Sequence, residues 1–173
     1  MSAGWDDARR RTVAAALDHA IPGDGVSPGA GEAGGAAYVE GLLGAFEVDP
    51  PRIWAGGPFS GRHGGEASFG EHLELGPWEA HAWRTRIAAW TATWDEGLVV
   101  LGDDFADLDD GARAARWGAT AEDFRELVFT QACESLYGDP VYGGNRDRAA
   151  WLAVDFRGDS QPAGYTDAEV TNP

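Results

Sequence analysis

Two long stretches dense in glycine and proline divide this chain, at residues 23–35 and 50–77. Proline cannot extend a helix interior or a central strand, and glycine weakens both, so neither stretch is expected to be regular. The segments between them carry apolar residues at three- and four-residue spacing, and none alternates cleanly as a strand does. The sequence therefore predicts an all-α fold, a single irregular helical domain over residues 1–173 with an extended tail at residues 157–173.

Helix start and stop signals locate the expected helices. They run from about Trp5 to Ala20, from near Tyr38 to Asp49, from Pro77 onward, from about Asp109 to Trp117, and from a Thr120 cap to Gly138. The third of these helices carries a stripe on one face, formed by Trp83, Ile87, Trp90 and Trp94. Packing in the chain's own core is the favoured interpretation of this stripe. A face shared with a partner protein is the alternative, since tryptophan is enriched at interface hot spots.

The charge balance excludes several classes of function. The chain has 13 basic residues, all arginine, against 29 acidic ones, for a net charge of −16. Without lysine there is no Schiff-base chemistry and no phosphate-loop lysine. So acidic a surface repels nucleic acid and anionic lipid, and no apolar run approaches a membrane span. The single cysteine, Cys133, excludes an internal disulfide and a thiolate zinc cluster, and its place in a helix favours a buried, inert thiol.

Several motifs are too weak to assign chemistry. Residues 29–34 match the dinucleotide fingerprint in letters, but no buried strand can precede them, so a flexible loop is favoured. The spacing of the candidate metal ligands His63, His72 and His81 fits no helical pair, which favours loop or solvent positions. Ser60 stands one place late for a nucleophile elbow, and the acidic pairs at residues 103–104 and 109–110 lack the alternating oxygens of a calcium loop. We assign no catalytic, cofactor or metal residue.

The most specific local sequence follows the last long helix. Glycine at residues 143 and 144 permits positive backbone angles, and the side chains of Asn145 and Asp147 can bond the local backbone. The planar fork of Arg146 can hold a carboxylate or several carbonyl groups. Two tyrosines and Trp151 are positioned to cover the turn. The pattern predicts a well-defined loop whose role is either structural or binding.

Residues 134–151, ESLYGDPVYGGNRDRAAW, resemble the signature of the gluconate 2-dehydrogenase subunit 3 family. The resemblance continues in Asp155–Tyr165 and, more loosely, in Leu17–Pro22, in residues 32–34 with the following Tyr38-Val39, and in Phe105–Leu108. It covers most of the chain and is strongest toward the end. Residues 50–77 look like an insertion relative to the family pattern.

The resemblance implies a non-catalytic small subunit that assists folding, flavin loading or export of a large subunit. That large partner belongs to the glucose–methanol–choline oxidoreductases, carries the FAD and oxidises a sugar or polyol, and a cytochrome subunit often takes the electrons. This chain is expected to carry no cofactor itself. The residues implied as partner contacts are Tyr137, Asp139, Pro140, Tyr142, Gly143, Gly144, Asn145, Arg146 and Trp151.

Two further segments bear on the cellular location of the protein and on a competing hypothesis for its function. Members of the family often carry a twin-arginine export signal, but Arg9–Arg11 precedes a run too short and too polar for one. We interpret it as a helix with a basic patch and expect a cytoplasmic protein, with the periplasm alongside its partner as the alternative. The competing hypothesis is an autonomous small-molecule-binding protein or minor enzyme that uses residues 50–77.

Overall fold

The computed structural model describes residues 4–49, 51–53, 55 and 74–156, and over these ranges the chain is all-helical, as predicted. The α-helices are α1 Asp7–Ala20, α2 Gly35–Leu43, α3 Pro77–Leu101, α4 Asp110–Gly118, α5 Glu122–Tyr137 and α6 Ala149–Ala153. The short 3-10 helices are η2 Phe105–Asp107, η3 Pro140–Tyr142 and η4 Arg146–Arg148. The tail at residues 157–173 and most of the predicted 50–77 loop lie outside the described residues.

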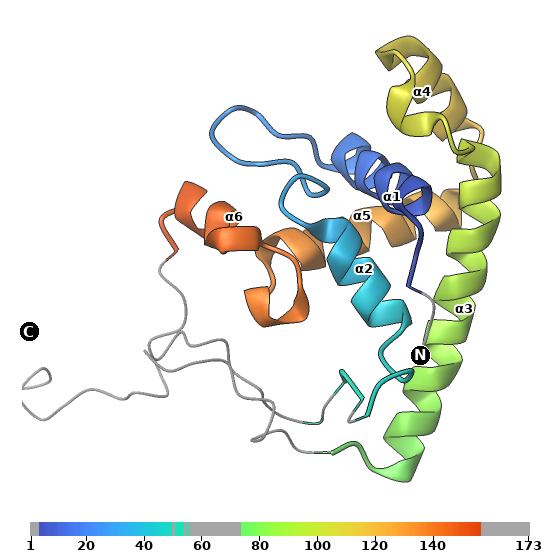
Figure 1. Cartoon of the computed structure of the whole chain (residues 1–173), viewed down its shortest axis with the longest axis vertical. Coiled ribbons are helices and arrows are strands. Elements are labelled where there is room, and N and C mark those ends of the chain that lie inside the picture. Colours follow the sequence, from blue (N-terminus) through green and yellow to red (C-terminus); the bar gives the residue numbers. More distant parts are fainter. Residues whose placement is uncertain (1–3, 50, 54, 56–73, 157–173) are drawn as a thin grey trace, which may run out of the picture.

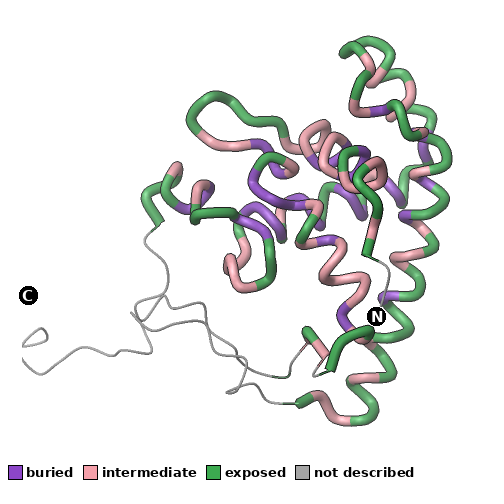
Figure 2. The backbone as a smooth tube through the Cα atoms, in the orientation of Figure 1, coloured by how far each residue is buried: buried purple, intermediate pink, exposed green. Residues whose placement is uncertain are grey.

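The core forms where α1, α2 and α5 meet the C-terminal half of α3 (Figures 1 and 2). Helix α5 is central, because it packs against α1, α2, α3 and α6. The largest fully buried apolar side chains include Leu17, Val39, Trp94, Leu101, Phe105, Phe124 and Leu136. They come from four helices and η2, so burial of apolar surface is what joins these elements.

Two predicted helix ends are wrong. The second helix ends at Leu43 rather than near Asp49, because Gly44 follows and the chain turns back through hydrogen-bonded turns. Thr120 does not cap α5, since Ala121 occupies the N-cap position. The Thr120 hydroxyl instead donates to the Trp117 carbonyl at 2.7 Å, which ties it to the end of α4. Pro77 at the start of α3 and Gly138 at the end of α5 are confirmed.

The tryptophan stripe of α3 packs in the core over its C-terminal half. Trp94 is fully buried, and its indole N–H donates to Oε1 of Gln131 at 2.8 Å. Ile87 is also buried. Trp83 and Trp90 are half-buried and contact each other edge to face, with ring centroids 6.2 Å apart. The core interpretation therefore holds for the deeper end of the stripe, and the other end lies at the surface.

The glycine-rich turn before α2 holds an internal carboxylate. Oδ1 of Asp18 accepts hydrogen bonds from the backbone N–H groups of Gly31 at 2.8 Å and Glu32 at 3.1 Å. A Cβ at Gly31 would stand 2.1 Å from the Ala14 carbonyl oxygen, so only glycine permits this approach to α1. In a dinucleotide-binding fold, backbone N–H groups at this place would point toward a phosphate. Here they donate to the Asp18 carboxylate of α1 instead. The motif is thus a close-packed joint and not the flexible loop that we expected.

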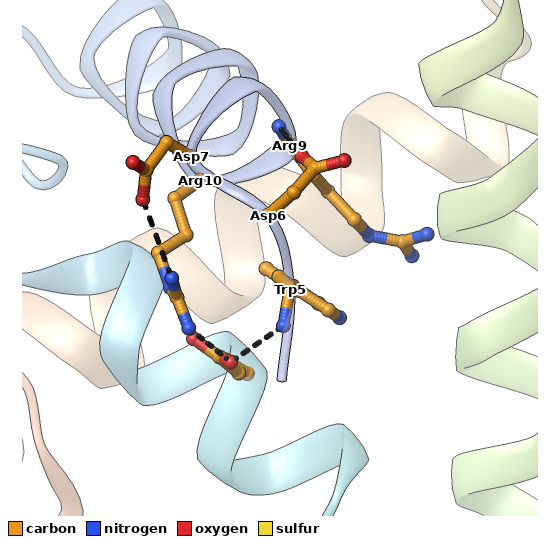
Figure 3. A network of polar contacts seen from close by, with 6 residues as sticks. Trp5, Asp6, Asp7, Arg9 and Arg10 are labelled. Atoms are coloured by element: carbon orange, nitrogen blue, oxygen red, sulfur yellow. Dashed lines mark hydrogen bonds and ion pairs between the residues drawn. The ribbon is translucent and has the colours of Figure 1, made fainter. Parts of the chain in front are cut away.

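The three arginines of α1 form ion pairs with neighbouring elements. Figure 3 shows the contacts of Arg10 and of Trp5 at the start of this helix. The pairs run from Arg9 to Asp95 of α3, from Arg10 to Glu40 of α2, and from Arg11 to Asp107 of η2. Arg10 binds both oxygens of Glu40 at 2.8 Å, and the backbone N–H of Trp5 donates to the same carboxylate at 2.9 Å. The predicted basic patch is therefore an ion-paired surface that fixes the start of α1.

The substitution Glu40→Gln tests this arrangement through its pH dependence. The hydrogen bonds from Arg10 lower the pKa of Glu40, with the Trp5 N–H acting in the same direction. The carboxylate therefore stabilises the fold above its ordinary pKa, and this stabilisation is lost as pH falls through the lowered folded-state pKa. We expect Glu40→Gln to have a lower Tm than wild type at about pH 7, and a smaller fall in Tm on going to about pH 3.

The matched control for Glu40→Gln is Glu126→Gln, which changes an exposed carboxylate on α5. Its acid-induced fall in Tm should follow the wild type. If Glu40→Gln and wild type lose the same Tm between the two pH values, the ion pair does not contribute to acid stability.

Candidate functional site

The segment after α5 folds into two tight turns before α6. The Asp139 side chain caps η3 by accepting from the Val141 N–H at 3.0 Å, and Gly143 then takes a φ of +99°. Further on, Asn145, Asp147 and Arg148 all have φ between 45° and 58°. A non-glycine residue in this left-handed region costs about 1 kcal/mol or more. Three of them in four positions require that the surroundings hold the turn in place.

Asn145 is the residue that holds the turn. Its side chain is fully buried, with Nδ2 donating to the Gly138 carbonyl at 3.2 Å and Oδ1 accepting from the Ala150 N–H at 3.1 Å. The indole N–H of Trp151 donates to the Tyr137 carbonyl at 2.8 Å. These bonds join the end of α5 to α6. Among the implied partner contacts, Gly144, Asn145 and Trp151 are therefore buried within this chain, where they shape the segment.

The turn also docks on the glycine-rich turn before α2. The backbone N–H of Arg146 donates to the Ala33 carbonyl at 2.8 Å, and a Cβ at Gly34 would stand 3.2 Å from the Gly143 carbonyl oxygen. Two stretches that carry the family resemblance thus contact each other. The Arg146 side chain is exposed and makes no hydrogen bond or ion pair with any other described residue.

A groove of about 820 Å³ lies between α2, the C-terminal end of α5 and η3. Four of the implied partner contacts, Tyr137, Asp139, Tyr142 and Gly143, line it. Pro140, also implied, lies half-buried at the start of η3. The groove further includes Tyr38, Trp83, Cys133 and Glu134, which the sequence did not single out as site residues. Its aromatic walls suit an apolar side chain, and its acidic groups suit a cation.

The polar groups of the groove are set for binding and not for nucleophilic chemistry. The Tyr38 hydroxyl donates to Oε2 of Glu134 at 2.9 Å. Burial raises the pKa of Tyr38, and the charge of Glu134 adds to the effect, so the phenol stays protonated at neutral pH. Burial also raises the pKa of the Cys133 thiol. Cys133 is half-exposed and lines the groove, so the prediction of a buried thiol is wrong.

A second cavity, of about 960 Å³, lies beside α1 and residues 22–29. His19 lines it, with its ring 5.0 Å from that of Trp117. Burial, together with the nearby charge of Arg113, lowers the pKa of His19. Arg113 itself is engaged, because it donates to the carbonyls of Ala106 at 3.1 Å and Leu108 at 2.8 Å. No sequence signal distinguished His19, and its surroundings are those of a histidine packed among aromatic rings.

The other candidate motifs separate in the structure. His81 is exposed on α3, while His63, His72 and Ser60 lie outside the described residues. Within the described ranges, no group of three His, Cys, Asp or Glu side chains could hold a metal ion. The acidic pairs have structural roles, since Asp104 pairs with Arg116 and Asp109 caps α4 through the Ala112 N–H at 2.8 Å. Over the same ranges, no helix is long and apolar enough to cross a membrane.

Comparison with family models, with curated proteins and with solved structures found no significant match. What points to a function is therefore the resemblance carried by residues 134–151 and the groove that these residues help to form.

Proposed function

We propose that this chain is the small, non-catalytic subunit of a flavin-dependent dehydrogenase or oxidase of the glucose–methanol–choline type. In this proposal the large subunit carries FAD, which accepts hydride from a hydroxyl of a sugar or polyol. The small subunit assists the folding, flavin loading or stability of the large one. The complex is placed in the cytoplasm, with the periplasm as the alternative and a cytochrome as a possible third component.

One observation carries the proposal: the residues that resemble the family signature form a wall of an open aromatic groove. Tyr137 and Tyr142 belong to that wall and stay exposed, while Asn145 and Trp151 hold it from behind. A turn with three strained non-glycine residues is costly to maintain for packing alone. A rigid, partly apolar surface of this kind is what a permanent subunit contact needs.

The direct test is co-expression with a flavoprotein of this class encoded beside the gene. Size exclusion should show a stable complex, and the flavin absorbance should follow the complex. The chain purified alone should be colourless and without dehydrogenase activity. A stoichiometric flavin on the isolated chain, or a flavoprotein that folds, loads flavin and elutes the same without it, would contradict the proposal.

The substitution Arg146→Ala should weaken assembly while leaving the chemistry unchanged. The backbone N–H of Arg146 is bound to Ala33, and its exposed guanidinium lies beside Gly34 without a hydrogen bond or ion pair to another described residue, so it can bind partner oxygens. We expect the affinity for the large subunit to fall at least about tenfold, roughly 1.4 kcal/mol, and flavin content to fall with it. Turnover per bound flavin should stay at the wild-type value.

Arg148→Ala is the matched control, because Arg148 is also exposed and lies in the same 3-10 helix. Its complex should form with near-normal affinity. A normal Arg146→Ala complex with lost turnover would instead show that the turn reaches the active site and takes part in the reaction.

A further inference from the structure

The apolar lining of the groove continues along the exposed face of α5. Phe129, Cys133 and Tyr137 are spaced four residues apart, which places them on one helix face. Phe129 is 54% exposed, Tyr137 50% and Tyr142 42%. Phe129 and Tyr137 thus flank Cys133 on this face, and large aromatic side chains left this open are typical of the centre of a protein interface. The row is longer than the groove, so it suits an extended segment better than a compact small molecule.

The charges around the groove select the kind of segment. Glu134 is exposed. Among the described residues, the Tyr38 hydroxyl donates a hydrogen bond to its Oε2, and no other hydrogen bond to this carboxylate is present. Asp139 also lines the groove, where its side chain caps η3, and Arg52 is the single cation among the described lining residues. A second copy of this chain brings a charge of −16 and is repelled. A basic segment is attracted, because charge complementarity across an interface favours the opposite sign.

We infer that the groove binds a segment of the large subunit that combines a large apolar side chain with an arginine or lysine directed at Glu134. This inference rests on the proposed function for the identity of the partner. The apolar side chain lies between Tyr38 and Tyr142, and its continuation follows the α5 row toward Phe129. An arginine there also gains from the tyrosine ring faces, which attract cations.

Cys133 supplies a reporter that needs no substitution. It is the only cysteine of this chain and lines the groove, so its alkylation by N-ethylmaleimide measures whether the groove is open. Because the thiol pKa is raised, the assay is run near pH 8.5, where the thiolate is more abundant. We expect the rate, followed by mass spectrometry of the intact chain, to fall at least about tenfold in the complex.

The substitution Glu134→Gln tests the charge. Glutamine keeps the shape and an acceptor for the Tyr38 hydroxyl, and removes only the negative charge. We expect the dissociation constant of the complex to rise about tenfold at low salt, with a smaller difference at high salt because exposed charges are screened. Glu96→Gln is the control: Glu96 is an exposed carboxylate of α3 that neither lines the groove nor belongs to the α5 row, and its loss should leave affinity unchanged.

The outcomes separate this inference from the proposed function. If the complex forms while Cys133 reacts as fast as in the free chain, or while Glu134→Gln binds as tightly as wild type, the inference is overturned and the proposed function stands. Protection of Cys133 in the isolated chain that rises with its own concentration shows a second copy in the groove, and also overturns it.

If no complex forms, the proposed function fails and the inference is decided with peptides at millimolar concentration. A peptide of alternating leucine and arginine should slow Cys133 alkylation, and its leucine–glutamate counterpart should not. Equal protection by both peptides, or by neither, overturns the inference.

Discussion

Replacing Gly144 with alanine is expected to destabilise the protein by about 3 kcal/mol or more. An added Cβ would stand 2.2 Å from the carbonyl oxygen of Ser135 and within 3 Å of its Cα. Ser135 is buried in the last turn of α5, so its backbone cannot move aside without disturbing the core. The turn must then lift off α5, which also breaks the Asn145 bonds. Thermal unfolding followed by circular dichroism should show a Tm lower by roughly 6–12 °C.

The control for Gly144→Ala is Gly118→Ala, at the end of α4. A Cβ there meets nothing within 4 Å, so the Tm should be unchanged or higher, by up to about 1 kcal/mol of added stability. Because Gly144 supports the groove wall, the Gly144→Ala chain should also lose complex with the large subunit. Equal Tm values for the two variants would show that the turn is not packed against α5 as described.

Replacing Trp94 with alanine should cost about 3–5 kcal/mol, the range for deleting a large buried aromatic side chain. The Trp94 ring is fully buried and packs edge to face on Phe124, with ring centroids 5.3 Å apart. Its loss leaves a cavity and an unpartnered Gln131 amide, whose Nε2 already has no partner among the described residues. Urea unfolding of the isolated chain measures the loss.

A double-mutant cycle separates the hydrogen bond from the packing. Trp94→Phe keeps an aromatic ring and leaves buried Oε1 of Gln131 without its donor, which costs about 1–3 kcal/mol for the polar atom alone. Gln131→Met removes that polar group at similar volume. The double variant should therefore be more stable than Trp94→Phe alone. If the double variant loses as much unfolding free energy as the two single variants together, the hydrogen bond between the indole and the amide contributes nothing specific to stability.

The helices were predictable where local chemistry decides them. Pro77 fixes the start of α3, and Gly138 marks the end of α5 through residue types that act within one turn. The prediction that Thr120 caps α5 was wrong because a hydroxyl before a helix is a good cap only when it faces that helix. Here the short connection between α4 and α5 leaves Thr120 buried and turned back to Trp117. That choice depends on packing, which no local pattern contains.

The groove could be predicted only in part. Tyr137 and Tyr142 belong to one unusual stretch of sequence, and the structure places both in the groove. Tyr38 comes from almost a hundred residues earlier, and no spacing rule relates residues so far apart. Asn145 and Trp151 share the same unusual stretch but are buried. An uncommon motif shows that a backbone shape is required, and does not show which of its side chains face outward.

The dependence of α1 on α5 sets the timing of folding during synthesis. The buried face of α1, which includes Val13 and Leu17, packs against a helix that begins only at Glu122. At a translation rate of about 5–20 residues per second, roughly a hundred residues separate the two helices by some 5–20 s. During that interval, only α2, α3 and η2, of the elements that pack on α1, are available to cover it. The last third of the chain is thus the part that closes the core, and a nascent chain still without α5 presents its apolar face to chaperones.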